Sequence, residues 1–169
     1  MRLTIYTDYA LRMLIYLGVN GDRLCSIGTI ATSYGISKNH LMKIVVDLAS
    51  NGMIESVRGN GGGIRLAKPP SEIAIGDVVR ITESDMFLVT CFDAAAPSCR
   101  ISSDCKLRAV LSQALAGFMS VLDGYTLADV IVNKQSRIQG LLGIEVVAAR
   151  HAPAESQTVA TRGVPRRLR

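Results

Sequence analysis

Tryptophan is absent from this chain of 169 residues, and aromatic residues make up only 5% of it. That scarcity argues against the stacked aromatic platforms that bind single-stranded nucleic acids or sugars. No uncharged apolar run approaches the roughly 18 residues of a membrane span. The apolar N-terminal stretch holds Asp8 and Arg12, and no secretory cleavage site follows it. We therefore expect a cytoplasmic protein without a membrane partner.

Cysteine and histidine are also scarce, with four cysteines and two histidines in the chain. The cysteines do not form CxxC pairs, so a zinc ribbon is not favoured. His40 and His151 lie far in sequence from every cysteine, and nothing indicates a Cys–His nucleophile pair. The glycine-rich segment 59–63 lacks the fingerprint of a nucleotide-binding loop. We therefore expect a protein that is not an enzyme.

The net charge of +5 is unevenly distributed. Residues 1–80 carry nine Lys and Arg against six Asp and Glu, and residues 150–169 carry five against one. The segment between them is mildly acidic. A basic first half is compatible with binding an anionic polymer such as DNA. The basic tail is weaker evidence, because solubilising tails are common.

The first 82 residues combine two closely spaced helices with a hairpin. Apolar residues recur at helical spacing in three segments, each with a capping residue type at its start. The predicted helices cover residues 7–19, 27–34 and 38–50, with Thr7, Ser26 and Ser37 as N-caps. Gly35 suits the left-handed position in the turn between the second and third helices. A hairpin with a glycine-rich tip follows over residues 53–66, so segment 1–82 is predicted to be a winged helix-turn-helix domain.

Polar and basic residues gather at the start of the third helix and around the hairpin tip. In a helix-turn-helix, the N-terminal residues of the second helix face base edges and phosphates. Lys and Ser suit phosphates, Asn can read adenine, and Lys can read guanine. The candidate DNA-binding residues are Ser37, Lys38, Asn39, His40, Lys43, Arg58, Asn60, Gly61 and Arg65. The alternative is a winged helix that contacts proteins, in which these charges are merely solvated.

A long amphipathic helix is predicted over residues 104–122. Its apolar stripe consists of Leu107, Val110, Leu111, Ala114, Leu115, Phe118 and Leu122. So small a chain has nothing obvious to cover this stripe, which favours packing against a second copy in a homodimer. Thr126 is expected to cap a short last helix, so residues 104–144 form the dimerisation helix and a C-terminal helix. Residues 145–169 lose all periodicity and are predicted to be a disordered basic tail. The expected fold class is mainly α with a small β-hairpin.

Three cysteines, Cys91, Cys99 and Cys105, lie within fifteen residues, in an irregular segment that leads into the long helix. An odd number does not suit a disulfide framework, and soft thiolates select iron–sulfur clusters, zinc or copper(I). Three thiolates with one missing ligand suit an iron–sulfur cluster completed by a different residue. Segment 83–106 is therefore predicted to be a cluster-binding loop. Cys25 follows Leu24 in an apolar context and is interpreted as a small buried hydrophobe.

Several motifs together resemble the Rrf2 family of winged-helix regulators, in order from residue 1 to about residue 144. They are RLTIYTDYALRMLIYL at the start, SKNHLMKIV, the wing RGNGGGIRLAKP, IGDVVRITE, and the cysteine stretch that runs from CFD to CKL. Within the family they look like the nitric-oxide-sensing repressors. The residues after about 144 lie outside the resemblance.

The resemblance implies a homodimeric repressor that binds a double-stranded DNA operator and carries one iron–sulfur cluster per subunit. The family's cluster cysteines map onto Cys91, Cys99 and Cys105. In some nitric-oxide-sensing members an Asp near the N-terminus of the other subunit is the fourth ligand, and the motif TDYALR places Asp8 there, with Arg12 as its ion-pair partner. The alternative for Asp8 is a plain N-terminal or capping carboxylate. Three Cys plus Asp resembles the ligand set of 4Fe–4S members more than that of a 2Fe–2S site.

Nitric oxide is the signal that the resemblance implies, with nitrosylation or loss of the cluster releasing the DNA. Two rival signals remain open. The iron-responsive branch of the family also has three cysteines, and a regulator without a cluster could use the same thiols as a redox switch. The branch that regulates cluster biogenesis has a His shortly after the third cysteine, and Leu107 departs from that pattern.

Overall fold

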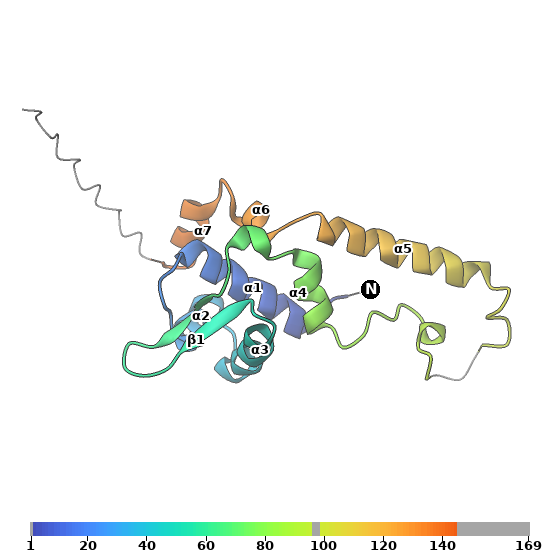
Figure 1. Cartoon of the computed structure of the whole chain (residues 1–169), viewed down its shortest axis with the longest axis horizontal. Coiled ribbons are helices and arrows are strands. Elements are labelled where there is room, and N and C mark those ends of the chain that lie inside the picture. The colour runs from blue at the N-terminus through green and yellow to red at the C-terminus, as the bar shows by residue number, and fades with distance from the viewer. Residues whose placement is uncertain (1, 96–98, 145–169) are drawn as a thin grey trace, which may run out of the picture.

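The computed structural model describes residues 2–95 and 99–144. It is mostly helical with one two-stranded antiparallel hairpin, as predicted (Figure 1). The predicted tail 145–169, with His151, lies outside the described residues. In chain order the elements are α1 (Ile5–Asn20), α2 (Ile27–Tyr34), α3 (Lys38–Ser50), β1 (Ile54–Val57), β2 (Gly63–Leu66), η1 (Pro70–Glu72), α4 (Ile75–Thr82), η2 (Thr90–Phe92), α5 (Lys106–Asp123), α6 (Leu127–Ile131) and α7 (Gln135–Leu141).

Helix α1 lies at the centre of the body, between α3 and the C-terminal helices α6 and α7 (Figure 1). Its buried residues recur at helical spacing, and Ala10, Met13, Leu14 and Leu17 are fully buried. The chain after the hairpin returns to the start of α6, where Leu127 N donates to Ile73 O at 2.8 Å. This pairing attaches the C-terminal helices to the same core as the winged helix.

The winged helix-turn-helix follows the sequence pattern closely. Ser26 caps α2, and Gly35 takes the left-handed conformation (φ 64°) in the turn before α3. The hairpin pairs Ile54 with Leu66 and Val57 with Gly63. The apolar residues that recur at helical spacing on α2 and α3 are buried: Ile30, Ala31, Leu41, Ile44, Val45 and Leu48. Apolar burial on one face of each helix therefore leaves the opposite face of α3 in solvent.

Two local predictions were wrong. The N-cap of α1 is Thr4 rather than Thr7, because the Thr4 hydroxyl accepts from Thr7 N and the helix begins at Ile5. The helix after Thr126 is not the last one, because α7 follows it. Helix α7 is only seven residues long and buries the polar Gln139, so its signal in the sequence is short. Ser37 stands at the predicted N-cap of α3 but its side chain makes no capping hydrogen bond.

Helix α5 extends away from the body, and the loop residues 83–95 and 99–105 lie between α4 and the first turn of α5 (Figure 1). It begins two residues later than predicted, because Cys105 takes the N-cap position. None of its residues is buried in the single chain. The apolar residues Leu107, Val110 and Val121 are each more than half exposed. Val121 lies outside the predicted stripe, and four stripe members, Leu111, Leu115, Phe118 and Leu122, are half-buried. The predicted stripe is therefore only partly covered in the single chain.

Candidate functional site

The start of α3 presents the predicted DNA-binding side chains to solvent. Lys38, Asn39, His40 and Lys43 are all exposed, while the opposite face of the helix is packed into the core. The ring of His40 lies 6.2 Å from the ring of Tyr9 on α1, measured between centroids. Helix α1 therefore packs beside α3.

The wing places a second set of predicted residues beside α3. Arg58, Asn60 and Gly61 are exposed at the hairpin tip. Lys38 and Gly62 line one cleft of about 260 Å³, whose other walls are the start of α2 and the hairpin strands. A Cβ atom at Gly62 would lie 2.3 Å from Val57 O, so the tip closes only with glycine there. The structure thus brings the start of α3 and the wing together.

Arg65 differs from the other predicted DNA-binding residues. It faces Glu55 across the hairpin and forms an ion pair with that carboxylate. Both side chains are about two-fifths exposed. A phosphate contact by Arg65 would therefore compete with Glu55. Arg58 forms no ion pair with any residue in the ranges 2–95 and 99–144.

The three loop cysteines are free thiols in three different settings. Cys91 lies in the short turn η2, Cys99 is exposed, and Cys105 is the N-cap of α5. In the described part of one chain, no group of three or more His, Cys, Asp or Glu side chains is placed to hold a metal ion. Residues 96–98, directly before Cys99, lie outside the described part.

The chemistry of these donors nevertheless fits an iron–sulfur cluster. Thiolates are the usual protein ligands of such clusters, and none of the three thiols is used in a disulfide. Cys105 lines a cavity of about 580 Å³ between the loop and α5, together with Phe92 and Arg108. Cys105 also stands at a helix N-terminus, which favours negative charge. The loop therefore offers suitable ligands and free space beside one of them.

Asp8 lies on the exposed side of the first turns of α1. Its carboxylate accepts from Arg12 Nε at 3.0 Å and lies 2.8 Å from Arg12 Nη2, so the expected ion pair is present. Asp8 is not the N-cap, which is Thr4. The Arg12 guanidinium also lies 6.0 Å from the centre of the Tyr34 ring on α2. Arg12 thus lies between Asp8 on its own helix and Tyr34 on α2.

Glu83 was missed in the sequence and ties the cysteine loop to α1. One of its carboxylate oxygens accepts from Thr4 N at 2.8 Å and from the buried Thr7 hydroxyl at 2.5 Å. Glu83 is the C-cap of α4 and the first residue of the loop. Its partners lie 76 and 79 residues away, so no local pattern indicates the contact.

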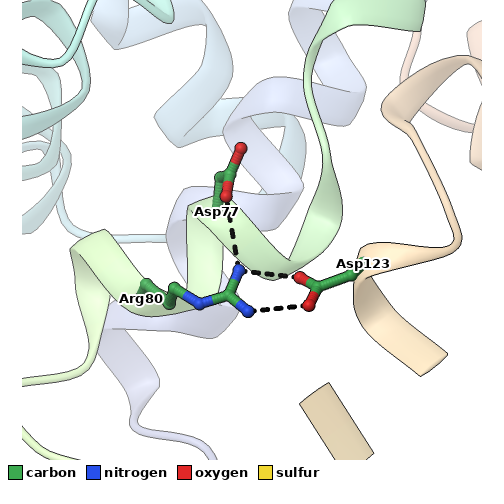
Figure 2. Close-up of polar contacts among 3 residues, drawn as sticks. All are labelled: Asp77, Arg80 and Asp123. Atoms are coloured by element: carbon green, nitrogen blue, oxygen red, sulfur yellow. Dashed lines mark hydrogen bonds and ion pairs between the residues drawn. The ribbon is translucent and has the colours of Figure 1, made fainter. Parts of the chain in front are cut away.

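A second missed contact joins the two helices that flank the loop. The two terminal nitrogens of Arg80 on α4 each donate a hydrogen bond of 2.7 Å to an oxygen of the Asp123 carboxylate (Figure 2). Asp123 is the last residue of α5. Asp77 lies 3.3 Å from the same guanidinium. The hydrogen bonds from Arg80 lower the pKa of Asp123 below its ordinary value. This bidentate pair attaches the C-terminal end of α5 to α4.

Gly76 makes that contact possible, because a Cβ atom there would lie 1.9 Å from Asp123 Oδ1. We predict that Gly76→Ala displaces the carboxylate and raises the pKa of Asp123 toward its ordinary value. A carbon-detected NMR titration of the side-chain carboxyl measures this. Gly117→Ala is the matched control, since nothing lies within 4 Å of its added Cβ. An unchanged Asp123 pKa in Gly76→Ala would contradict the assigned contact.

Cys25 is held apart from the loop cysteines. Its backbone exchanges hydrogen bonds with Ile64 of β2, at 3.1 and 2.9 Å. Burial raises the pKa of its thiol to about 11. Its surroundings are those of a small core residue, as the sequence indicates.

A raised thiol pKa predicts slow alkylation of Cys25, because the thiolate is the nucleophile. Relative to an ordinary thiol with a pKa of 9.0, the thiolate fraction at pH 8 is lower by about a hundredfold. We therefore expect iodoacetamide to label Cys99 well before Cys25 in metal-free protein. Mass spectrometry measures the labelling rate of each cysteine. In urea the difference should disappear. Equal labelling rates in the folded protein would show that Cys25 is open to solvent.

Among residues 2–95 and 99–144, no helix is both long enough and apolar enough to cross a membrane.

Comparison with known proteins matches this chain to transcriptional regulators. The sequence model of the Rrf2 family, described as iron-dependent transcriptional regulator, matches residues 3–133. The HTH-type transcriptional regulator NsrR of Bacillus licheniformis is 50% identical over 143 residues, covering 84% of this chain and 99% of the relative. NsrR of Bacillus subtilis is 51% identical over 136 residues, covering 80% and 93%. The solved structure of T. potens IscR superposes with a TM-score of 0.65 at 24% identity, covering 81% of this chain and 90% of that one, which shows a shared fold.

Proposed function

Because this chain belongs to the Rrf2 family of transcriptional regulators and not to a family of enzymes, we propose that it is a cytoplasmic repressor that binds operator DNA and senses nitric oxide through an iron–sulfur cluster. The observation that carries the proposal is the position of the three free thiols. They lie in the loop that joins the winged helix directly to α5. In this proposal residues 1–82 bind DNA, 83–106 hold the cluster, and 104–144 make the dimer.

Cys91, Cys99 and Cys105 would hold a 4Fe–4S cluster, with Asp8 of the partner subunit as the fourth ligand. A carboxylate is a harder and weaker ligand for this iron than a thiolate, so that corner is the labile one. When bound, the cluster supplies iron that reacts with nitric oxide. Asp8 can leave Arg12 at little cost, because an exposed pair four residues apart on a helix contributes only a few tenths of a kcal/mol.

The homodimer is proposed from the exposed apolar residues of α5. A second copy covers Leu107, Val110 and Val121, which are otherwise exposed to water. A twofold dimer presents two copies of α3, which fits half-sites one DNA turn apart. The partner's α1 then comes within reach of the loop, as the Asp8 assignment requires.

Changes at the loop have two ways to reach α3. At its start, Glu83 holds the first turn of α1, which contacts α3. At its end, α5 is attached through Asp123 and Arg80 to α4, which packs against both α1 and α3. Loss of the Asp8 link frees α1 of the partner subunit, and the two recognition helices lose their spacing for the half-sites.

An iron-supply signal is the second candidate, because the matching family is described as iron-dependent. A thiol switch is the third, because all three loop cysteines are free. Anaerobic purification tests the three together, with iron, sulfide and DNA affinity measured before and after cluster removal. We expect brown protein that binds operator DNA more tightly with the cluster. A colourless protein whose affinity follows thiol oxidation would support the switch, and a brown one indifferent to nitric oxide would support iron.

A further inference from the structure

The solvent face of α3 carries two large apolar side chains among its polar ones. Met42 is 44% exposed and Val46 is 62% exposed. They are four residues apart, so they are neighbours along one side of the helix. The buried side of α3 is filled by other residues, so neither side chain takes part in the core. Single exposed apolar residues are ordinary on protein surfaces, but these two form a continuous apolar strip.

This strip lies directly beside the polar DNA-binding candidates. Asn39 precedes Met42 by three residues, and Lys43 precedes Val46 by three, so all four share the exposed face. Lys38 adds a positive charge at the start of the helix. Asp47 is the one acidic residue of α3, and its carboxylate accepts from the Tyr6 hydroxyl at 2.5 Å. A face that combines cationic and apolar groups complements a polyanion that also displays apolar groups.

We propose that Met42 and Val46 read thymines, by covering their 5-methyl groups in the major groove of the operator. The thymine methyl is the apolar group among the base edges of the major groove, and apolar side chains recognise it by contact. Asn39 and Lys43 beside the strip are free to pair with the polar edges of neighbouring bases. The inference rests on the proposed DNA-binding function and adds to it the bases that this chain prefers.

Replacing thymine by deoxyuridine tests the proposal, because uracil pairs identically and lacks only the methyl group. The duplex is one selected from a random pool by the full-length protein with its cluster intact. Each contacted thymine should lose about three- to fourfold in affinity when its methyl is removed. The double variant Met42→Ala, Val46→Ala should bind the thymine and uracil duplexes equally. Alanine is favourable in helices, so we expect α3 to stay folded, and circular dichroism checks this.

Val132→Ala is the matched control, since Val132 is 56% exposed at the end of α6 and should leave the thymine-to-uracil ratio unchanged. A wild-type protein that binds duplex DNA but is indifferent to every thymine methyl overturns this inference alone. So does a ratio that persists in the double variant. If the double variant instead changes the oligomer in light scattering, the strip is a protein interface and the inference fails. A wild-type protein that binds no duplex overturns the proposed function as well.

Discussion

The variant Cys99→Ala is expected to be colourless after anaerobic purification and to lose its cluster-dependent affinity for operator DNA. Cys99 is exposed in the loop and is one of only three thiols there. Alanine leaves two thiolates, too few to hold the cluster without further ligands. The coupling between cluster and DNA should then vanish, a loss of about 5- to 150-fold in affinity for a typical allosteric pair. Absorbance, iron and sulfide content, and DNA binding at fixed salt measure it.

Cys25→Ala supplies the control for that experiment. It removes one thiol from the same chain, but Cys25 lies against β2, away from the loop. Its colour and iron content should match those of the wild type. Unchanged iron content in Cys99→Ala would refute the ligand assignment, whatever happened to DNA binding.

The double variant Lys38→Ala, Arg58→Ala is expected to weaken DNA binding by roughly tenfold to a hundredfold while the cluster absorbance stays intact. Lys38 opens α3 and Arg58 stands at the wing, and both are exposed. Each phosphate contact releases counterions, so the slope of log affinity against log salt should fall by about one per lost contact. Titrations of labelled duplex at several salt concentrations measure both quantities.

Lys134→Ala is the charge-matched control for a single lysine. Lys134 is the N-cap of α7, and α7 lies on the other side of α1 from α3 (Figure 1). Its loss should leave the salt slope unaltered. If Lys38→Ala, Arg58→Ala lost its colour, the two residues would belong to the cluster site and their assignment to DNA would be wrong.

Local patterns predicted the winged helix because its signals are local. Ser26, Gly35 and the apolar spacing of α3 each act within a few residues, and each is confirmed. The N-cap of α1 was misplaced because Thr4 and Thr7 are equally good capping types, and only the packing of Thr7 against Glu83 separates them. Helix α7 was not predicted because one of its buried residues is polar. The Gln139 side chain donates a hydrogen bond of 2.6 Å to Val19 O on α1.

Local sequence patterns could not predict the long-range contacts. Arg80 and Asp123 are 43 residues apart, and their contact is visible only in the folded chain (Figure 2). The need for glycine at position 76 follows from the nearby Asp123 carboxylate, which the sequence does not reveal. The cysteine spacing predicts a cluster, but one chain does not gather three ligands among its described residues. The proposed fourth ligand comes from another copy, so the full site depends on an assembly that neither the sequence pattern nor a single chain contains.

The most direct test of this account is an anaerobic titration of the purified protein with nitric oxide, with absorbance and operator binding followed at each addition. The account predicts brown protein whose colour bleaches stoichiometrically while the DNA is released in step. Asp8→Asn should keep the protein folded but weaken this coupling. Equal DNA affinity before and after complete bleaching would contradict the central claim, and would leave a DNA-binding regulator that answers to another signal.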